Sequence, residues 1–148
     1  MGLFGSLDIS ASALSAERLR MDVTAENLAN AQSTRTANGG PYRRKEVVLE
    51  AAGGGFASAL ASARAGNPSG GPDGGVRVAG VVEDQSPNRL VYDPGHPDAN
   101  AQGYVSMPNV NPVTEMVDLI TASRSYEANV TAMQTSKQMF SKTLDLLR

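Results

Sequence analysis

The chain of 148 residues contains no cysteine and no tryptophan, and only three phenylalanines and four tyrosines. The absence of cysteine excludes a disulfide framework, a thiolate metal site and a cysteine nucleophile. A dense aromatic core is excluded as well. A marked excess of one charge is also missing, because 13 basic and 15 acidic side chains give a net charge of −2. The sequence therefore predicts no broad attraction to nucleic acid or to an anionic membrane surface.

A secretory leader and a long apolar run are missing too. The first residues, Met1–Ser6, lack the basic start and the unbroken apolar stretch of a signal peptide, and no later window is apolar enough to insert into a bilayer. Taken alone, this pattern predicts a cytosolic protein. A dedicated secretion machine that needs no cleaved signal is the exception to this rule.

Glycine and proline number 15 and eight, yet residues 6–30 contain neither. This stretch is rich in good helix formers, so we expect a helix. Apolar side chains recur in it every seven residues, with Arg18 as the polar interruption between them, which is typical of a coiled-coil seam. The recurring residues are Leu7, Leu14, Met21 and Leu28.

A second long helix is predicted from Pro112 to the C-terminus. Asn111 can cap it, and Pro112 suits the first helical position. Eight of the ten heptad positions that follow are apolar, namely Met116, Leu119, Tyr126, Val130, Met133, Phe140, Leu144 and Leu147. We expect the two helices to pack as an antiparallel coiled-coil hairpin.

Between the helices the sequence predicts a small β-rich middle. Short strands are expected at residues 42–50, 76–82, 89–92 and 104–107, separated by turn sequences rich in glycine and proline. Residues 51–75 are mostly Gly, Ala, Ser and Pro, and we expect a flexible loop there with a helical turn at 56–64. The fold class is thus mainly α, with a helical domain formed by residues 1–34 and 111–148 and a β-rich domain at 35–110.

Two helices leave apolar side chains without an obvious partner inside the chain. Leu19, Val23, Val117 and Ile120 lie on the flanks of the two seams. We therefore expect neighbouring subunits to cover them, and the ends of an isolated chain to be partly disordered until assembly.

Two stretches resemble the signatures shared by flagellar rod, hook and hook-filament junction proteins. One is Ala25-Glu26-Asn27-Leu28-Ala29-Asn30-Ala31. The other comprises residues 109–111, then Glu115-Met116-Val117-Asp118 and Arg124-Ser125-Tyr126-Glu127-Ala128-Asn129. Three more stretches, 39–45, 92–98 and 103–111, resemble the proximal-rod, C-type members of the flagellar basal-body rod protein family. The interval between residues 51 and 75 carries no such resemblance.

The resemblance implies a structural subunit that polymerises with other rod proteins into a helical shaft, which transmits torque from motor to hook. It implies location in the flagellum basal body, in the rod that spans the periplasm, and export by the flagellar type III apparatus without a cleaved signal peptide. The implied partners are other rod proteins, the membrane-ring protein and further copies of the chain. Nucleic acid, direct membrane insertion, catalysis, metal and cofactor are not implied.

The assembly interface is expected on the two seams. Its predicted residues are Leu7, Leu14, Met21, Asn27, Leu28, Asn30, Met116, Leu119, Tyr126, Val130, Met133, Phe140, Leu144 and Leu147. For Asn27 and Asn30 two interpretations stand side by side: hydrogen bonds that fix the register of subunits, or ordinary residues at a helix C-terminus.

The residues give little support for a metal site, an acid–base pair or an enzyme active site. His96 is the only histidine and lies between Gly95 and Pro97, so a turn is favoured over a metal site. Glu83 and Asp84 are adjacent and would point to opposite faces of a strand. The two rival functions are a peptidoglycan-acting enzyme, which normally needs paired carboxylates and aromatic platforms, and a coiled-coil export adaptor.

Overall fold

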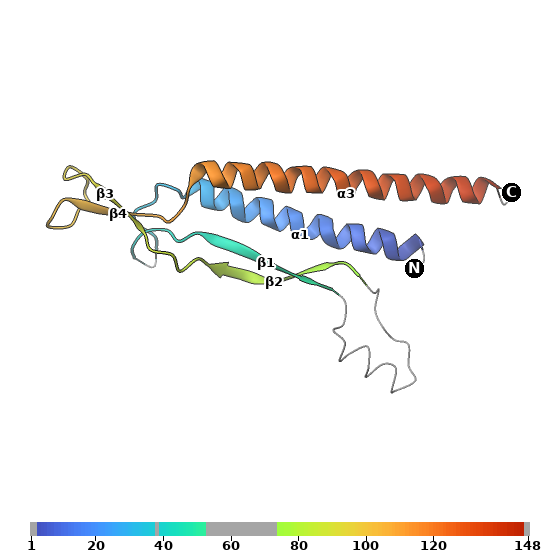
Figure 1. The fold of residues 1–148 in the computed structure, drawn as a ribbon, viewed down its shortest axis with the longest axis horizontal. Helices are drawn as coiled ribbons and strands as arrows, with labels where there is room; N and C mark the ends of the chain where they lie inside the picture. Colours follow the sequence, from blue (N-terminus) through green and yellow to red (C-terminus); the bar gives the residue numbers. More distant parts are fainter. Residues whose placement is uncertain (1–2, 38, 53–73, 147–148) are drawn as a thin grey trace, which may run out of the picture. The chain divides into compact units, whose positions relative to one another are not determined.

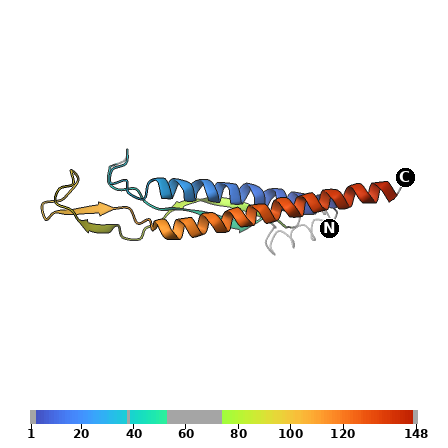
Figure 2. The ribbon, with the colours of Figure 1, turned by 90° about the horizontal axis from the view of Figure 1, so that it is seen from above.

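The computed structural model describes residues 3–37, 39–52 and 74–146 of the chain. Most of the predicted loop at 51–75, its helical turn and the predicted interface residue Leu147 therefore lie outside the described residues. The elements follow in the order α1 (Leu3–Ala29), β1 (Lys45–Ala51), β2 (Val76–Glu83), β3 (Arg89–Tyr92), β4 (Tyr104–Met107) and α3 (Pro112–Leu146). Both views show α1 and α3 as unbroken helices (Figure 1, Figure 2). The architecture is two long helices with a small β region between them, as predicted.

Hydrogen bonds between residues close in sequence define the start of α3 and the end of α1. The cap predicted for α3 is confirmed, because the Val113 N–H donates to Asn111 Oδ1 at 3.1 Å and the Glu115 N–H donates to the Asn111 carbonyl at 3.0 Å. At the other helix, the Asn30 N–H still bonds the Glu26 carbonyl, whereas the Ala31 N–H bonds Leu28, which tightens the last turn of α1.

The strands form two separate two-stranded sheets, β1 with β2 and β3 with β4. β3 and β4 are antiparallel, with Tyr92 opposite Tyr104 and Leu90 opposite Ser106, and their bounds are those predicted. β1 begins at Lys45 and not at Tyr42, which corrects the prediction. The reason is that the Tyr42 N–H bonds the Ser33 carbonyl and the Arg44 N–H bonds Asn109 Oδ1, so neither donor is free for a strand ladder.

The chain divides into two compact units. The first comprises Met1–Arg18, Leu49–Ala79 and Ser123–Arg148. In it the hydroxyl of Ser12 accepts the Val76 N–H at 3.1 Å and donates to the Ile9 carbonyl at 2.7 Å. Gly75, at φ +111°, lies so close to this hydroxyl that an added Cβ would meet Ser12 Oγ at 2.9 Å. The start of β2 is thus held against α1 by a polar contact that a larger residue at 75 would disturb.

The second unit comprises Leu19–Val48 and Gly80–Ala122 and holds most of the buried residues. Ala31, Tyr42 and Val110 form one apolar cluster, and Val105 and Ala122 are buried as well. Val23 is only 7% exposed, so the expectation that it needs another subunit is wrong. Val117 and Ile120 are 57% and 53% exposed in the single copy, and their cover by another subunit stays a prediction.

Among the described helices, none combines the length and the apolar character that crossing a bilayer requires.

Candidate functional site

Asn27 is the centre of a buried polar network in the second unit. The side chain is 1% exposed. Its amide group donates to the Lys45 carbonyl at 2.8 Å and to Glu115 Oε2 at 3.0 Å, and its carbonyl oxygen accepts the Lys45 N–H and the Tyr42 hydroxyl, each at 2.9 Å. Both amide protons and both lone pairs are therefore used, as a buried amide requires.

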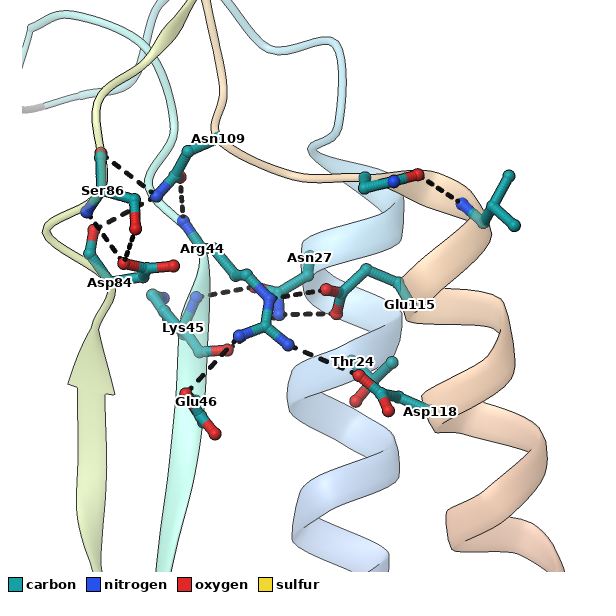
Figure 3. Close-up of polar contacts among 12 residues, drawn as sticks. Thr24, Asn27, Arg44, Lys45, Glu46, Asp84, Ser86, Asn109, Glu115 and Asp118 are labelled. Atoms are coloured by element: carbon teal, nitrogen blue, oxygen red, sulfur yellow. Dashed lines mark hydrogen bonds and ion pairs between the residues drawn. The ribbon is translucent and has the colours of Figure 1, made fainter.

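Arg44 brings the start of β1 together with α3 (Figure 3). Its Nε donates to Glu115 Oε1 at 2.7 Å, and its terminal nitrogens lie 3.4 Å from Asp118 and 3.5 Å from Glu46. The hydrogen bond to Glu115 raises the pKa of Arg44 above its usual value. Because the Glu115 side chain is only 1% exposed, its charge depends on Arg44 and on the amide of Asn27 for stabilisation.

Asn109 extends this arrangement to the turn after β2. Its carbonyl oxygen accepts the Arg44 N–H at 2.8 Å, and its amide group donates to the carbonyls of Asp84 and Ser86. Asp84 in turn accepts the N–H and the hydroxyl of Ser86, and these bonds lower the pKa of Asp84. Asp84 therefore caps the turn that the sequence predicts at residues 86–88, and Figure 3 shows the group in one view.

Tyr42 packs its ring into the apolar cluster and points its hydroxyl to Asn27. Burial, followed by the charge of Glu26, raises the pKa of Tyr42 to about 12. The Lys45 ammonium lies 5.6 Å from the centre of the ring and 2.6 Å from Glu26 Oε1. Tyr42 is thus an apolar anchor with one satisfied polar atom, which is the usual state of a buried tyrosine.

An open cavity of about 580 Å³ lies beside the network, lined among others by Glu26, Arg43, Lys45 and Glu83. Its charges are mixed, and Lys45 is already paired with Glu26. In the parts of the chain that the structure describes, no three His, Asp or Glu side chains gather in a way that could hold a metal ion.

His96 belongs to a turn, as the sequence predicts. Its N–H bonds the Asp93 carbonyl at 3.3 Å, and its ring Nδ1 accepts the Asp98 N–H at 3.1 Å. Asp98 is also engaged, since it accepts the Thr34 hydroxyl and pairs with Arg35 at 3.0 Å.

The predicted interface residues fall into three groups. Those half-buried along the helices are Leu7, Leu14, Met21, Leu28, Leu119, Tyr126, Val130 and Met133. Those exposed are Met116, Phe140 and Leu144. Asn27 is buried inside the chain's own network, whereas the side chain of Asn30 bonds the Glu26 carbonyl and accepts the Ser33 hydroxyl, both within four residues along the chain. The two asparagines of one signature therefore have different surroundings.

The network itself was not predicted from the sequence, although Asn27 and Glu115 both lie in the quoted signatures. One signal was available for Asn27. It lies four residues after Val23 and three after Thr24, both of which are buried on the same face of α1. A polar residue on such a face has to find hydrogen-bond partners inside the protein.

Comparison with known proteins finds two matching families. Residues 7–35 match the family described as flagella basal body rod protein, and residues 101–146 match the family described as flagellar basal body rod FlgEFG protein C-terminal. The chain is 53% identical to the flagellar basal-body rod protein FlgC of Bacillus subtilis, over 99% of each chain. It is 47% identical to that of Escherichia coli O157:H7, over 99% of this chain and 98% of the relative. It is 42% identical to that of Borreliella burgdorferi, over 100% and 99%.

Proposed function

Because the chain belongs to the FlgC family of flagellar basal-body rod proteins, and is thus a structural rod subunit and not an enzyme, we propose that it assembles through its two terminal helices. Its place is the basal-body rod. We propose further that this is the proximal, periplasm-spanning part of the rod, and that the assembled shaft passes torque from the motor to the hook.

The observation that carries this proposal is the exposure of large apolar side chains on α3. Met116, Phe140 and Leu144 occupy predicted seam positions, yet they are 49%, 38% and 52% exposed. Exposed apolar side chains that gather on one element commonly mark a protein–protein interface. A single copy leaves the exposed part of these side chains in water, and covering it stabilises the assembly by roughly 25 cal/mol per Å² of apolar area removed from water.

Within one copy we propose that α1 and α3 pack as an antiparallel coiled-coil hairpin. Support comes from the half-buried state of the seam residues Leu14, Met21, Leu119 and Tyr126. The hydrogen bond from Asn27, near the end of α1, to Glu115, in the first turn of α3, suits helices that run in opposite directions. Polar contacts of this kind fix the register of packed helices.

The proposed assembly surface therefore has two parts. The half-buried seam residues, together with Asn30 and Leu147, are expected to be covered further by neighbouring subunits, and the exposed residues Met116, Phe140 and Leu144 to be covered by them outright. Asn27 acts inside the subunit. We propose that the neighbours are other rod proteins, the membrane-ring protein and further copies, and that the flagellar type III apparatus exports the chain without a cleaved signal peptide.

The test replaces an exposed apolar residue of α3 in cells that make the variant as their sole copy. Leu144→Asp is expected to abolish swimming and to remove the chain from isolated basal bodies, because a charge buried in a subunit contact has no partner. Thr135→Asp, on an exposed position of the same helix, is the matched control and is expected to keep both. Normal rods with Leu144→Asp would contradict the proposed surface.

The same preparation distinguishes the rival functions. An export adaptor would stay in the cytosol and be missing from purified basal bodies, and a peptidoglycan-acting enzyme would clear a suspension of purified cell wall. A rod subunit is expected to be present in the basal bodies and to leave the turbidity of the cell wall unchanged.

A further inference from the structure

β3 is the more exposed strand of the hairpin that β3 and β4 form in the second unit (Figure 1). All four of its residues are exposed, and the large side chains of Leu90 and Tyr92 are 66% and 65% exposed. In β4, by contrast, Val105 is only 2% exposed. β3 is therefore the strand of this hairpin that remains open to contact.

The backbone groups of Leu90 and Tyr92 point away from β4. The Asp93 N–H donates to the Gly103 carbonyl at 2.9 Å, so the hairpin is hydrogen-bonded at this pair. In an antiparallel ladder, hydrogen-bonded pairs alternate with pairs that are not bonded to each other. The groups of Val91 therefore face β4, whereas the N–H and C=O groups of Leu90 and Tyr92 lie on the outer edge of β3.

The outer edge of β4 is closed at its start, and that of β3 is not. The Tyr104 N–H donates to Asn100 Oδ1 and the Tyr104 carbonyl accepts the Asn100 N–H, each at 2.9 Å. Within the described residues, no such partner occupies the outer backbone groups of Leu90 or Tyr92. A strand edge with unused donors and acceptors readily pairs with a strand of another molecule.

The sequence of this edge is complementary to itself. When two copies of β3 run antiparallel and are centred on Val91, Arg89 of each copy lies opposite Asp93 of the other. Leu90 then lies opposite Tyr92 of the other copy, so the two most exposed apolar side chains of β3 contact each other. In the single copy, neither Arg89 nor Asp93 belongs to an ion pair within the described part of the chain. Both charges are thus available for a second copy.

The same register also suits the backbone. Leu90 and Tyr92 of facing copies exchange N–H···O=C bonds in both directions, because the outward groups of β3 belong to these two residues. A slip by one residue would turn the bonding groups away from each other, and a slip by two would move Arg89 away from Asp93. Hydrogen bonds and charges therefore favour one and the same alignment.

We propose that β3 pairs antiparallel with β3 of a second copy, so that the two hairpins join into one four-stranded sheet. The contact is isologous and closes on two copies. It goes beyond the proposed function, because it uses the β region and not the terminal helices. A stable interface takes about 20–30 residues on each side, and the β3 edge offers only residues 89–93, so the dimer is weak and forms at high protein concentration.

A single cysteine captures such a dimer, since the chain has none of its own. Val91→Cys lies at the centre of the pairing, where the two Cα atoms are roughly 4.5 Å apart and within the range of a disulfide. The purified full-length chain is oxidised at high concentration in a glutathione buffer and separated on a non-reducing gel. We expect a covalent dimer as the main product.

Leu90→Cys is the matched control. Leu90 is more exposed than Val91, at 66% against 36%, so random collision would cross-link Leu90→Cys faster. In the proposed pairing, the two copies of position 90 are offset by two residues and lie roughly 8 Å apart, which is too far for a disulfide. We therefore expect the dimer to form at least about tenfold faster from Val91→Cys than from Leu90→Cys.

The charges test the register. Arg89→Asp in the Val91→Cys chain puts like charges opposite each other and is expected to lower the dimer yield about three- to tenfold. Adding Asp93→Arg restores opposite charges and is expected to restore the yield. Arg77→Asp makes the same change at an exposed residue of β2 and is expected to have little effect.

Circular dichroism of each variant checks that the fold is kept. If Val91→Cys does not fold, Arg89→Cys with Asp93→Cys repeats the test, because these positions lie opposite each other between copies and roughly 13 Å apart within one copy. No dimer from a folded variant, equal rates from Val91→Cys and Leu90→Cys, or no recovery in the charge-swapped chain would each overturn the proposal. The proposed rod function does not depend on any of these results.

Discussion

The buried network around Asn27 and the last turns of α3 use opposite kinds of contact. In the network, Asn27, Arg44 and Glu115 are polar or charged, and each is held by several partners at defined distances. In the last turns, Met139 and Leu144 are apolar and more than half exposed. The comparison teaches that hydrogen bonds and ion pairs, which depend on direction, hold the fold of the single copy together. Apolar surface, whose burial does not depend on direction, is left exposed for contact with other molecules.

The largest expected effect on stability follows from removing the buried carboxylate. Glu115→Ala leaves Arg44 without its nearest partner and Asn27 with a free donor, so we expect the free energy of unfolding to fall by about 3–5 kcal/mol. Urea denaturation followed by circular dichroism measures it. Glu127→Ala, an exposed carboxylate of the same helix, is the control and is expected to change stability by less than about 0.5 kcal/mol. Equal effects would contradict a special role for the network.

The next effect distinguishes the two asparagines of one signature. Asn27→Ala removes four hydrogen bonds and leaves buried groups of Lys45 and Glu115 unsatisfied, so we expect a loss of about 3 kcal/mol. Asn30→Ala removes two local side-chain bonds, one exposed and one part-buried, and is expected to cost less than about 1 kcal/mol. Both are measured by the same denaturation experiment, and the reverse order would show that the network is not the stable region.

Alkaline pH is expected to weaken the network through Tyr42. Its pKa is raised from 10.0 to about 12, so the folded chain keeps the phenolic proton where the unfolded chain loses it. The contribution is complete below about pH 10, and it is lost at about 1.4 kcal/mol per pH unit as the pH rises towards 12. Denaturation at several pH values, with Tyr42→Phe as the reference, measures it. An identical pH dependence in both chains would contradict this assignment.

A smaller effect concerns the turn between β3 and β4. Gly103 has φ +82°, and an added Cβ would approach the ring of Tyr92 to 2.9 Å, so Gly103→Ala is expected to cost about 1–2 kcal/mol. Gly95 lies earlier in the same connection between β3 and β4 without such a φ, and its Cβ would meet nothing closer than 3.5 Å. Gly95→Ala is therefore the control, and thermal unfolding of both variants compares them.

The smallest effect on the single copy is expected in the last turns of α3. Leu144→Asp changes a side chain that is already half exposed, so the free energy of unfolding should shift by less than about 0.5 kcal/mol. The same variant is expected to fail in rod assembly. A large loss of stability in the isolated chain would show that the end of α3 belongs to the fold of the single copy.

Much of the fold follows from local sequence. Three local signals predict the ends of the helices and strands to within a few residues. They are the cap at Asn111, the run without glycine or proline before residue 30, and the turn sequences. The start of β1 was missed because Ser33 occupies the backbone donor of Tyr42 and Asn109, 65 positions along the chain, occupies that of Arg44. A competing partner of this kind leaves no trace in the local pattern.

The heptad pattern also assigned Met116 to a seam in which the structure does not bury it. It groups Met116 with Leu119 in one seam, whereas the structure leaves Met116 exposed beside Val113, Val117 and Ile120. A straight helix has 3.6 residues per turn and drifts away from a strict seven-residue repeat, so an outlying position can move to another face. The resemblance identified the family, but only three-dimensional contacts separate fold from assembly surface within its signatures.

The bond between Asn27 and Glu115 spans 88 positions of the chain. Closing so long a loop costs entropy before any contact repays it, and folds with distant pairings form slowly. In a chain that is made from its N-terminal end, Asn27 can bond Tyr42 and Lys45 early, but its bond to Glu115 has to wait for the last quarter of the chain. A copy that stops short of residue 115 therefore leaves one amide proton of Asn27 without its carboxylate acceptor, and the network of the second unit is formed only after most of the chain has been made.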